Sequence, residues 1–301
     1  MKKVLIIRNG SLGDLILTLP VFQTFRKNGY KITVAGRRDY VEFLKKLNCI
    51  DSFLPLDGTI FLELFSPEIK IDIDFLKGFD FILSYTHQNE IFSKNLKKIA
   101  DCRKIVFHPI QNDKLNMHIT DYLISPIKKF FSEIETVPYI QINNKNEEYF
   151  LIHPGSGSKY KNWPVENFLT VFRHFSKNNK VLILLGEGEE NQIHFWKRNV
   201  AIEDLIILPN FDKLIEIFQN TRIYLGNDSG ITHLAGAFGI KTFAIFGPTS
   251  PLIWGPRGKI VKIIFKQVGC NPCIEEKRKY CEKRKCLEEI IPEEVIEKID
   301  Q

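Results

Sequence analysis

The chain has 301 residues, enough for two domains of ordinary size, and 44% of them are hydrophobic and 26% charged. No apolar run approaches the roughly 20 residues that a membrane-spanning helix needs, so no transmembrane helix is expected. The net charge of +6 fits an anionic substrate or an anionic membrane surface, and it does not single out nucleic acid. The sequence shows neither a stacking-aromatic RNA motif nor a helix-turn-helix pattern, so we do not expect a nucleic-acid partner.

The N-terminal segment reads MKKVLIIRNGSLGD, in which lysines precede an apolar run, and a signal peptide must be considered. The apolar run covers only residues 4–7, and no small-residue cleavage site follows it. We therefore interpret this segment as a first β-strand and expect a cytoplasmic protein.

The first half of the chain alternates short apolar strands with helical stretches. We expect strands at 3–7, 31–35, 52–56, 79–84 and 104–107, and helices at 14–27, 40–47, 68–77, 91–99 and 117–127. This alternation predicts a parallel sheet covered by helices on both faces. The polar segment 141–148 is interpreted as a linker, which divides the chain into domains 1–145 and 146–301.

The loop after the first strand contains Ser11 and Gly13 and ends at Asp14. Its spacing is not the GxGxxG of dinucleotide-binding folds, and Arg37 and Arg38 stand where an acidic residue would follow the second strand, so a nicotinamide dehydrogenase is disfavoured. Asp14 lies at a helix start, where it can cap the helix or act as a general base. The two arginines can contact anionic sugars and phosphates or remain solvated surface charges.

The second half repeats the α/β alternation. We expect strands at 149–153, 181–185, 205–208, 223–225, 242–246 and 260–265, and helices at 164–176, 189–200, 212–219, 230–238 and 292–299. The predicted architecture is two Rossmann-like, doubly wound domains that face each other across a cleft. Such domains bind ligands at the carboxyl ends of their strands.

The second half opens with a loop of small residues, HPGSGSKYKNWP, that starts at residue 153. Its small residues, Gly155 and Ser156 among them, leave backbone N–H groups free to cradle an anion, and Lys161 adds a positive charge. The loop lacks the Walker spacing, and a solvated surface loop is the alternative. A later loop, GEGEE at 186–190, carries carboxylates that can bind ribose hydroxyls or favour a helix start.

The stretch GNDSGITHLAGAFG between the strands at 223–225 and 242–246 predicts a helix with a ligand-binding start. Asp228 and Ser229 are good N-cap residues, and Gly230 lets a ligand approach the backbone. The unpaired N–H groups and the positive dipole end of such a helix suit a phosphate, which His233, one turn further on, can also reach. The alternative is a capped crossover with a histidine that is satisfied within the fold.

Four cysteines lie within the strongly basic segment 270–286, at Cys270, Cys273, Cys281 and Cys286. Four thiols at this spacing can hold a structural Zn²⁺, although the spacing is irregular for a zinc knuckle. Disulfides are disfavoured in a reducing cytosol, except in thermophiles, and free or redox-active thiols are the third possibility.

Taken in order, these segments resemble the ADP-heptose–lipopolysaccharide heptosyltransferase family. The resemblance rests on SLGDLILTLP, HPGSGSKYKNWP, GEGEE, and GNDSGITHLAGAFG followed by FGPTSP. It implies the GT-B fold and an inverting transfer of heptose from ADP-heptose to the inner core of lipopolysaccharide, with no cofactor required. It also implies a lipid-linked oligosaccharide acceptor and contact with the cytoplasmic face of the inner membrane.

The resemblance further implies roles for particular residues. Asp14 matches the proposed catalytic base, Lys161 the lysine on the donor diphosphate, and Glu190 the ribose-binding glutamate. The other donor-binding positions are Gly155, Ser156, Phe211 near the adenine, Asp228, Ser229, Gly230 and His233, and the acceptor-side positions are Ser11, Gly13, Arg37 and Arg38. No specific match covers residues 30–140, so the accepted sugar is not predicted. The alternatives are a GT-B enzyme that uses another nucleotide sugar and a non-catalytic module that binds nucleic acid through the basic segment.

Overall fold

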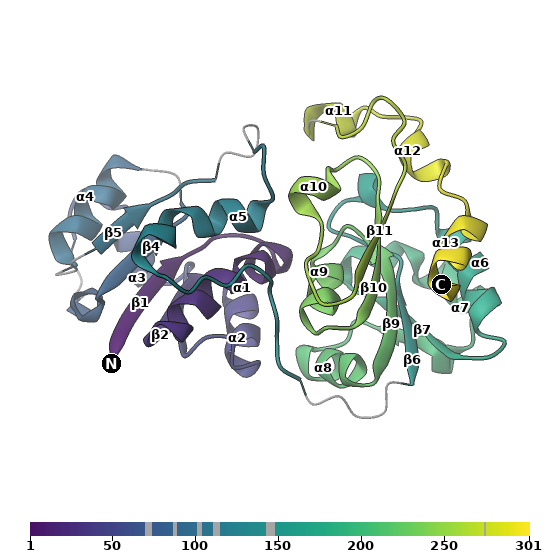
Figure 1. Ribbon diagram of the computed structural model, residues 1–301, viewed down its shortest axis with the longest axis horizontal. Coiled ribbons are helices and arrows are strands. Elements are labelled where there is room, and N and C mark those ends of the chain that lie inside the picture. The colour runs from purple at the N-terminus through teal and green to yellow at the C-terminus, as the bar shows by residue number, and fades with distance from the viewer. Residues whose placement is uncertain (70–73, 87–88, 101–103, 111–114, 143–147, 274) are drawn as a thin grey trace. The chain divides into compact units, whose positions relative to one another are not determined.

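The computed structural model describes the chain except for residues 70–73, 87–88, 101–103, 111–114, 143–147 and 274 (Figure 1). The described residues form two compact units, Met1–Pro138 and Tyr139–Gln301. The domain boundary expected after residue 145 and the middle of the expected linker lie outside the described residues. Among the helices that are described, none is both long and apolar enough to cross a membrane.

The first unit is built on a parallel sheet with the strand order β3-β2-β1-β4-β5. Its strands are β1 (Lys2–Ile7), β2 (Tyr30–Gly36), β3 (Ser52–Pro55), β4 (Phe81–Ser84) and β5 (Lys104–Phe107). Residues 4–7 of the central strand are fully buried, as expected for a parallel strand covered on both faces. The chain runs outward from β1 to β3 and then starts again beside β1 with β4, so the sheet has a topological switch point between β1 and β4.

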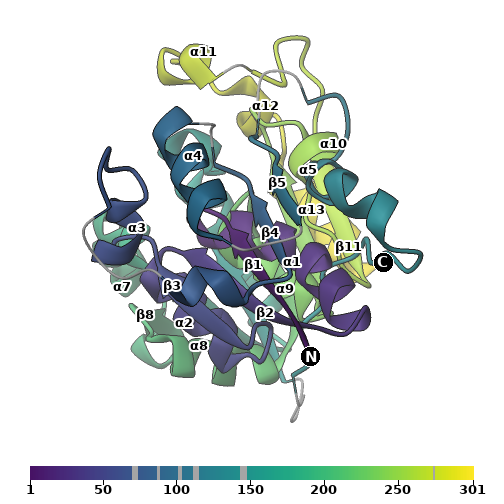
Figure 2. The ribbon, with the colours of Figure 1, turned by 90° about the vertical axis from the view of Figure 1, so that its left-hand side faces the viewer.

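Helices cover both faces of the first sheet (Figure 2). They are α1 (Leu12–Lys27), α2 (Arg38–Lys46), α3 (Thr59–Glu63), the 3₁₀ helix η1 (Asp74–Gly78), α4 (Glu90–Ile99), α5 (Ile119–Ile124) and the 3₁₀ helix η3 (Ser125–Phe130). On one face α1 packs against α5, and the ring of Phe25 meets that of Phe81 at 5.1 Å, edge to face. On the other face the side chains of Phe92 and Leu96 from α4 belong to the same core as Ile82 of β4.

Two helices of the first unit differ from the sequence-based expectation. The helix expected at 68–77 lies partly outside the described residues, and the described part is loop followed by η1. The short helix α3 was not expected. Isolated helices of about one turn carry too few residues for a 3.6-residue pattern to emerge, so their position depends on tertiary packing.

The second unit has a parallel sheet in the order β11-β10-β9-β6-β7-β8. Its strands are β6 (Tyr149–His153), β7 (Lys180–Leu185), β8 (Leu205–Ile207), β9 (Thr221–Asn227), β10 (Lys241–Phe246) and β11 (Val261–Phe265). The chain runs outward from β6 to β8 and then starts again on the other side of β6 with β9. This switch point places the loops after β6 and β9 beside each other, where doubly wound sheets bind ligands.

Helices also cover both faces of the second sheet (Figure 1). The unit contains η4 (Lys159–Lys161), α6 (Val165–Phe175), η5 (Glu187–Gln192), α7 (Ile193–Asn199), η6 (Ile202–Asp204), α8 (Phe211–Gln219), α9 (Gly230–Ala237), α10 (Pro251–Trp254), α11 (Glu275–Lys279), α12 (Lys285–Glu288) and α13 (Pro292–Asp300). On one face, Phe168 of α6, Trp196 of α7 and Val295 of α13 share a buried core. On the other, α9 packs against β9 and β10. The single helix expected at 189–200 is instead η5 followed by α7.

Candidate functional site

The loops that follow β6 and β9 are joined by one fully buried side chain, Asn227, at the end of β9. Its amide nitrogen donates to the carbonyl of Pro154 at 2.8 Å, and its amide oxygen accepts from the backbone N–H of Trp163 at 2.9 Å. Both ends of the loop after β6 are therefore fixed to the end of β9, 64 residues or more further along the chain.

Lys161 and Asp228 meet beside the start of α9. The ammonium of Lys161 lies 3.0 Å from Oδ2 of Asp228, and the hydroxyl of Thr249 donates to the same oxygen at 2.7 Å. Nε2 of His233 lies 4.0 Å from Oδ1 of Asp228. The amino end of α9, a lysine and a histidine thus surround one carboxylate, and an incoming diphosphate can take the place of that carboxylate as the partner of Lys161.

Ser229 and Gly230 form the start of α9 as expected from their residue types. Ser229 is the N-cap residue, and its hydroxyl accepts from the backbone N–H of Thr232 at 3.3 Å. Ser229 is buried, whereas Gly230, the first helical residue, is half-buried. In the neighbouring loop Ser156 donates to the carbonyl of Ser158 at 2.8 Å or to Oδ1 of Asn162 at 2.6 Å, which keeps this loop compact.

The loop after β7 carries three carboxylates, of which Glu189 is buried and Glu187 and Glu190 are exposed. Glu189 accepts from the backbone N–H of Gly186 at 2.9 Å, and its carboxylate lies against Gly155 so closely that a Cβ there would be 1.7 Å from Oε1. A side chain at position 155 would therefore displace the carboxylate of Glu189. Sequence reasoning drew attention to Glu190 and missed Glu189. Phe211, the first residue of α8, is half-buried beyond the carboxyl end of β8.

In the first unit, Asp14 is held by two neighbours at the carboxyl end of β1. Its Oδ2 accepts from both the backbone N–H and the hydroxyl of Ser11 at 2.8 Å, and its Oδ1 accepts from the guanidinium of Arg8 at 2.9 Å. The side chain of Asp14 stays 30% exposed, so a ligand can reach it. Gly13 is buried in the first turn of α1.

Arg8 was missed by the sequence analysis. It directly follows the buried strand β1 and lies six residues before Asp14. It is 6% exposed. Burial lowers the pKa of Arg8, and the adjacent Asp14 opposes this effect. The hydrogen bond from the buried guanidinium fixes the orientation of the partly exposed carboxylate of Asp14.

A family model described as "Glycosyltransferase family 9 (heptosyltransferase)" matches residues 114–283, which is more than half of the chain. The chain belongs to this family. It is therefore a glycosyltransferase, as the sequence predicts. The matched range includes Lys161, Asp228 and His233 and starts after Asp14.

Individual relatives agree with this assignment to family 9. The chain is 26% identical to "Lipooligosaccharide heptosyltransferase 2" of Campylobacter jejuni over 237 residues, which cover 72% of this chain and 74% of the relative. Among solved structures, E. coli ADP-heptose lps heptosyltransferase II is similar with a TM-score of 0.75 at 14% identity, covering 100% and 98% of the two chains. E. coli heptosyltransferase WaaC with ADP-2-deoxy-2-fluoro heptose has a TM-score of 0.68 at 15% identity and covers 99% of both. The expected fold class, GT-B with two Rossmann-like domains, is confirmed.

Two basic residues expected on the acceptor side of this family 9 chain, Arg37 and Arg38, lie on the surface at the start of α2. Arg37 is 3.9 Å from Asp39, and Arg38 is 3.8 Å from Glu42. The side chains of all four residues are at least half exposed, so these ion pairs contribute little to stability. Because β2 lies beside β1, both arginines follow a strand whose carboxyl end neighbours the Asp14 loop.

A structural zinc site, one of the three possibilities for the cysteines of the basic segment, receives no support from the structure. Cys270 is exposed, Cys273 and Cys281 are half-buried, Cys286 is buried, and all four are free thiols. Within the part of the chain that is described, no three His, Cys, Asp or Glu side chains are arranged to hold a metal ion. Cys286 instead packs in the apolar core of the second unit, where burial raises its pKa to about 11.

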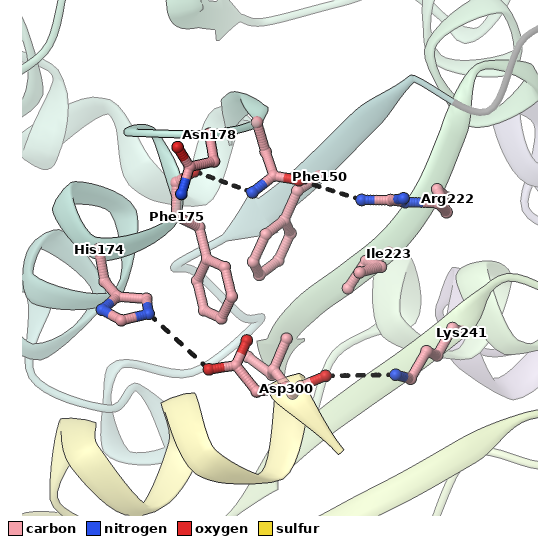
Figure 3. Close-up of a pocket in the computed structure, with 10 residues that line it drawn as sticks. Phe150, His174, Phe175, Asn178, Arg222, Ile223, Lys241 and Asp300 are labelled. Carbon is pink, nitrogen blue, oxygen red and sulfur yellow. Dashed lines mark hydrogen bonds and ion pairs between the residues drawn. The ribbon is translucent and has the colours of Figure 1, made fainter.

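A cavity of about 400 Å³ lies in the second unit at the amino-terminal ends of the strands, opposite to the loops described above (Figure 3). Lys241 donates to the carbonyl of Ile299 at 3.2 Å, and His174 lies 3.8 Å from Asp300. These contacts join α6 and α13 to the strand ends. Since doubly wound folds bind their ligands at the carboxyl ends of the strands, we interpret this cavity as a packing junction.

Proposed function

We propose that the chain transfers heptose from ADP-heptose, with inversion, to the inner core of lipopolysaccharide, and that no metal takes part. The observation that carries the proposal is the meeting of Lys161, Asp228 and His233 at the amino end of α9, beside the switch point between β6 and β9. The relatives support it through their names, one being a lipooligosaccharide heptosyltransferase and another a heptosyltransferase solved with an ADP-heptose analogue.

In this proposal the second unit binds the donor. Lys161 and the N–H groups of Ser229 and Gly230 stabilise the negative charge that develops on ADP as it leaves. The backbone of Gly155 and Ser156 lines the same loop, and Glu190, exposed beyond β7, accepts hydrogen bonds from the ribose hydroxyls. The ring of Phe211 backs the adenine.

In the same proposal the first unit supplies the general base that deprotonates the acceptor. Inverting transfer requires a group that removes the proton from the acceptor hydroxyl as it attacks the anomeric carbon. Asp14 takes this role, because Arg8 and Ser11 hold its carboxylate and leave part of it exposed. Ser11 and Gly13 flank the acceptor, and Arg37 and Arg38 attract its phosphates and acidic sugars.

A GT-B enzyme with a different nucleotide sugar is the second candidate, because no residue discussed above distinguishes ADP from other nucleoside diphosphates by itself. We expect a calorimetric titration of the purified protein to show binding of ADP-heptose, with UDP- and GDP-sugars at least about tenfold weaker. Tighter binding of a UDP- or GDP-sugar would replace the proposed donor, and binding of none of them would remove the donor-site assignment.

A lipid-linked acceptor also requires the enzyme to reach a membrane, and the basic segment after β11 suits an anionic one. Tyr280 is 85% exposed there, and four exposed lysines lie within five residues of it in the sequence, namely Lys277, Lys279, Lys283 and Lys285. Each lysine near an anionic surface contributes about 1 kcal/mol to attraction, and an amphipathic aromatic side chain adds anchoring at the interface.

We expect co-sedimentation of the protein with phosphatidylglycerol vesicles, and its loss when these four lysines are changed to glutamine. A matched control changes four exposed lysines elsewhere on the same unit, Lys177, Lys197, Lys259 and Lys298, and should bind like the wild type. Equal binding of both quadruple variants would reject the segment as the membrane contact.

A further inference from the structure

Three buried polar side chains at the carboxyl ends of the neighbouring strands β7, β6 and β9 lie in a row, each within 3.4 Å of the next. Glu189 follows β7, His153 ends β6, and Ser229 follows β9. Oε2 of Glu189 lies 3.4 Å from Nε2 of His153, and Nδ1 of the same ring lies 3.4 Å from the hydroxyl of Ser229. None of the three side chains is more than 7% exposed.

The order of groups in this row determines which imidazole nitrogen carries the proton. A carboxylate beside Nε2 requires the proton there, so Nδ1 of the neutral ring is an acceptor for the hydroxyl of Ser229. The same hydroxyl has a second possible acceptor, Oγ1 of Thr232 at 3.0 Å. Its oxygen accepts from the N–H of Thr232, while the hydroxyl of Thr232 donates to the carbonyl of Asn227.

Glu189 is fixed in the ionised state despite its burial. Burial alone raises the pKa of its carboxyl, but the hydrogen bonds from His153 and from the N–H of Gly186 oppose this effect, and the pKa is lowered. The carboxylate also lies directly against Gly155 in the phosphate-binding loop. A single side chain therefore contacts the loop after β6 and, through His153, the start of α9.

We propose that Glu189 and His153 are positioning residues that hold the N-cap of α9 and the Gly155 loop in the geometry that binds the donor diphosphate. Neither touches the substrate. Glu189 selects the ring tautomer, His153 orients the hydroxyl of Ser229, and Ser229 sets the direction of the N–H groups at the start of α9. This inference rests on the proposed function, because it assigns the purpose of these contacts to ADP binding.

The test compares ADP affinity by calorimetry in the full chain for the wild type, Glu189→Gln, His153→Gln and the double variant. Glu187→Gln is the matched control, because Glu187 is an exposed carboxylate on the same loop and has no assigned role. Each single variant is expected to weaken ADP binding about tenfold, since loss of a group that orients a ligand-binding residue typically has an effect of this size. The double variant is expected to lose no more than one single variant, and Glu187→Gln to stay within about twofold.

The melting temperature of each variant is measured alongside, and all titrations are run well below the lowest value. A purely structural role would lower the melting temperature and leave the ADP affinity of the folded protein unchanged, and this result would overturn the proposal. Multiplicative losses in the double variant would show that the two residues act separately and would also overturn it. If Glu189→Gln does not fold, His153→Gln, Ser229→Ala and their double variant provide the same comparison. Failure of the wild type to bind ADP would instead reject the proposed function.

Discussion

Turnover is expected to fall by at least about a thousandfold in Asp14→Asn, because an amide cannot accept the proton that the acceptor hydroxyl loses. ADP affinity should stay within about twofold of the wild type, since the proposed donor site consists of residues of the second unit. Steady-state ADP release and calorimetric ADP titration measure the two quantities. The substitution keeps the size of the side chain, and one oxygen remains to accept from Ser11.

A matched control for this variant is Asp39→Asn. Asp39 is also an acidic residue in the first turn of a helix, and its carboxylate is exposed and paired only loosely with Arg37, at 3.9 Å. Its loss should leave turnover within about twofold. A wild-type rate in Asp14→Asn would remove this residue as the base, and an equal loss in both variants would attribute the effect to the loss of a negative charge at a helix start.

Lys161→Ala is expected to weaken ADP binding about a hundredfold. A charge-assisted contact to phosphate contributes about 1.5–3 kcal/mol, and the variant also leaves the buried carboxylate of Asp228 without its closest cation, so that it repels the incoming phosphates. Calorimetry at one fixed ionic strength is the measurement, because the interaction is screened by salt.

Lys159→Ala serves as the matched control for the loss of ADP binding in Lys161→Ala. Lys159 lies in the same 3₁₀ turn, is exposed, and contacts the ring of Tyr160 rather than a carboxylate. It should bind ADP within about threefold of the wild type. An unchanged affinity in Lys161→Ala would exclude this lysine from the diphosphate site, and equal losses in both variants would indicate a general effect of net charge.

The strands were the most predictable part of the fold. Residues 4–7 and 181–185 are continuous apolar runs bounded by polar residues, and such runs form buried parallel strands wherever helices cover both faces. The helix cap at Ser229 was similarly local, since it depends on a side chain and a backbone N–H three residues apart. The helix expected to begin at an Asp212 cap begins instead at Phe211, with Asn210 as its cap. Short helices such as α3 and η1 were not predictable, because packing rather than local pattern decides them.

The side-chain contacts within the candidate site were much less predictable than the loops that form it. Glu189 and Glu190 are adjacent and chemically identical, yet only Glu189 is buried against Gly155, because η5 turns one carboxylate inward and the other outward. The partner of Asp14 was also not evident, since several residue types could follow a first strand. Four close-spaced cysteines suggested zinc, whereas the fold uses Cys286 as a core residue.

The sequence by itself determined the α/β alternation, the loops of small residues after the strands, and the family resemblance, since each depends on residues within a few positions of one another. The tertiary structure decided which loops meet: Lys161 with Asp228, and Glu189 with His153 and Ser229. The physical reason is strand order. The arrangement β9-β6-β7 brings loops from three distant parts of the chain to one edge, and the energy that selects this order comes from the burial of whole faces of the sheet rather than from any local segment.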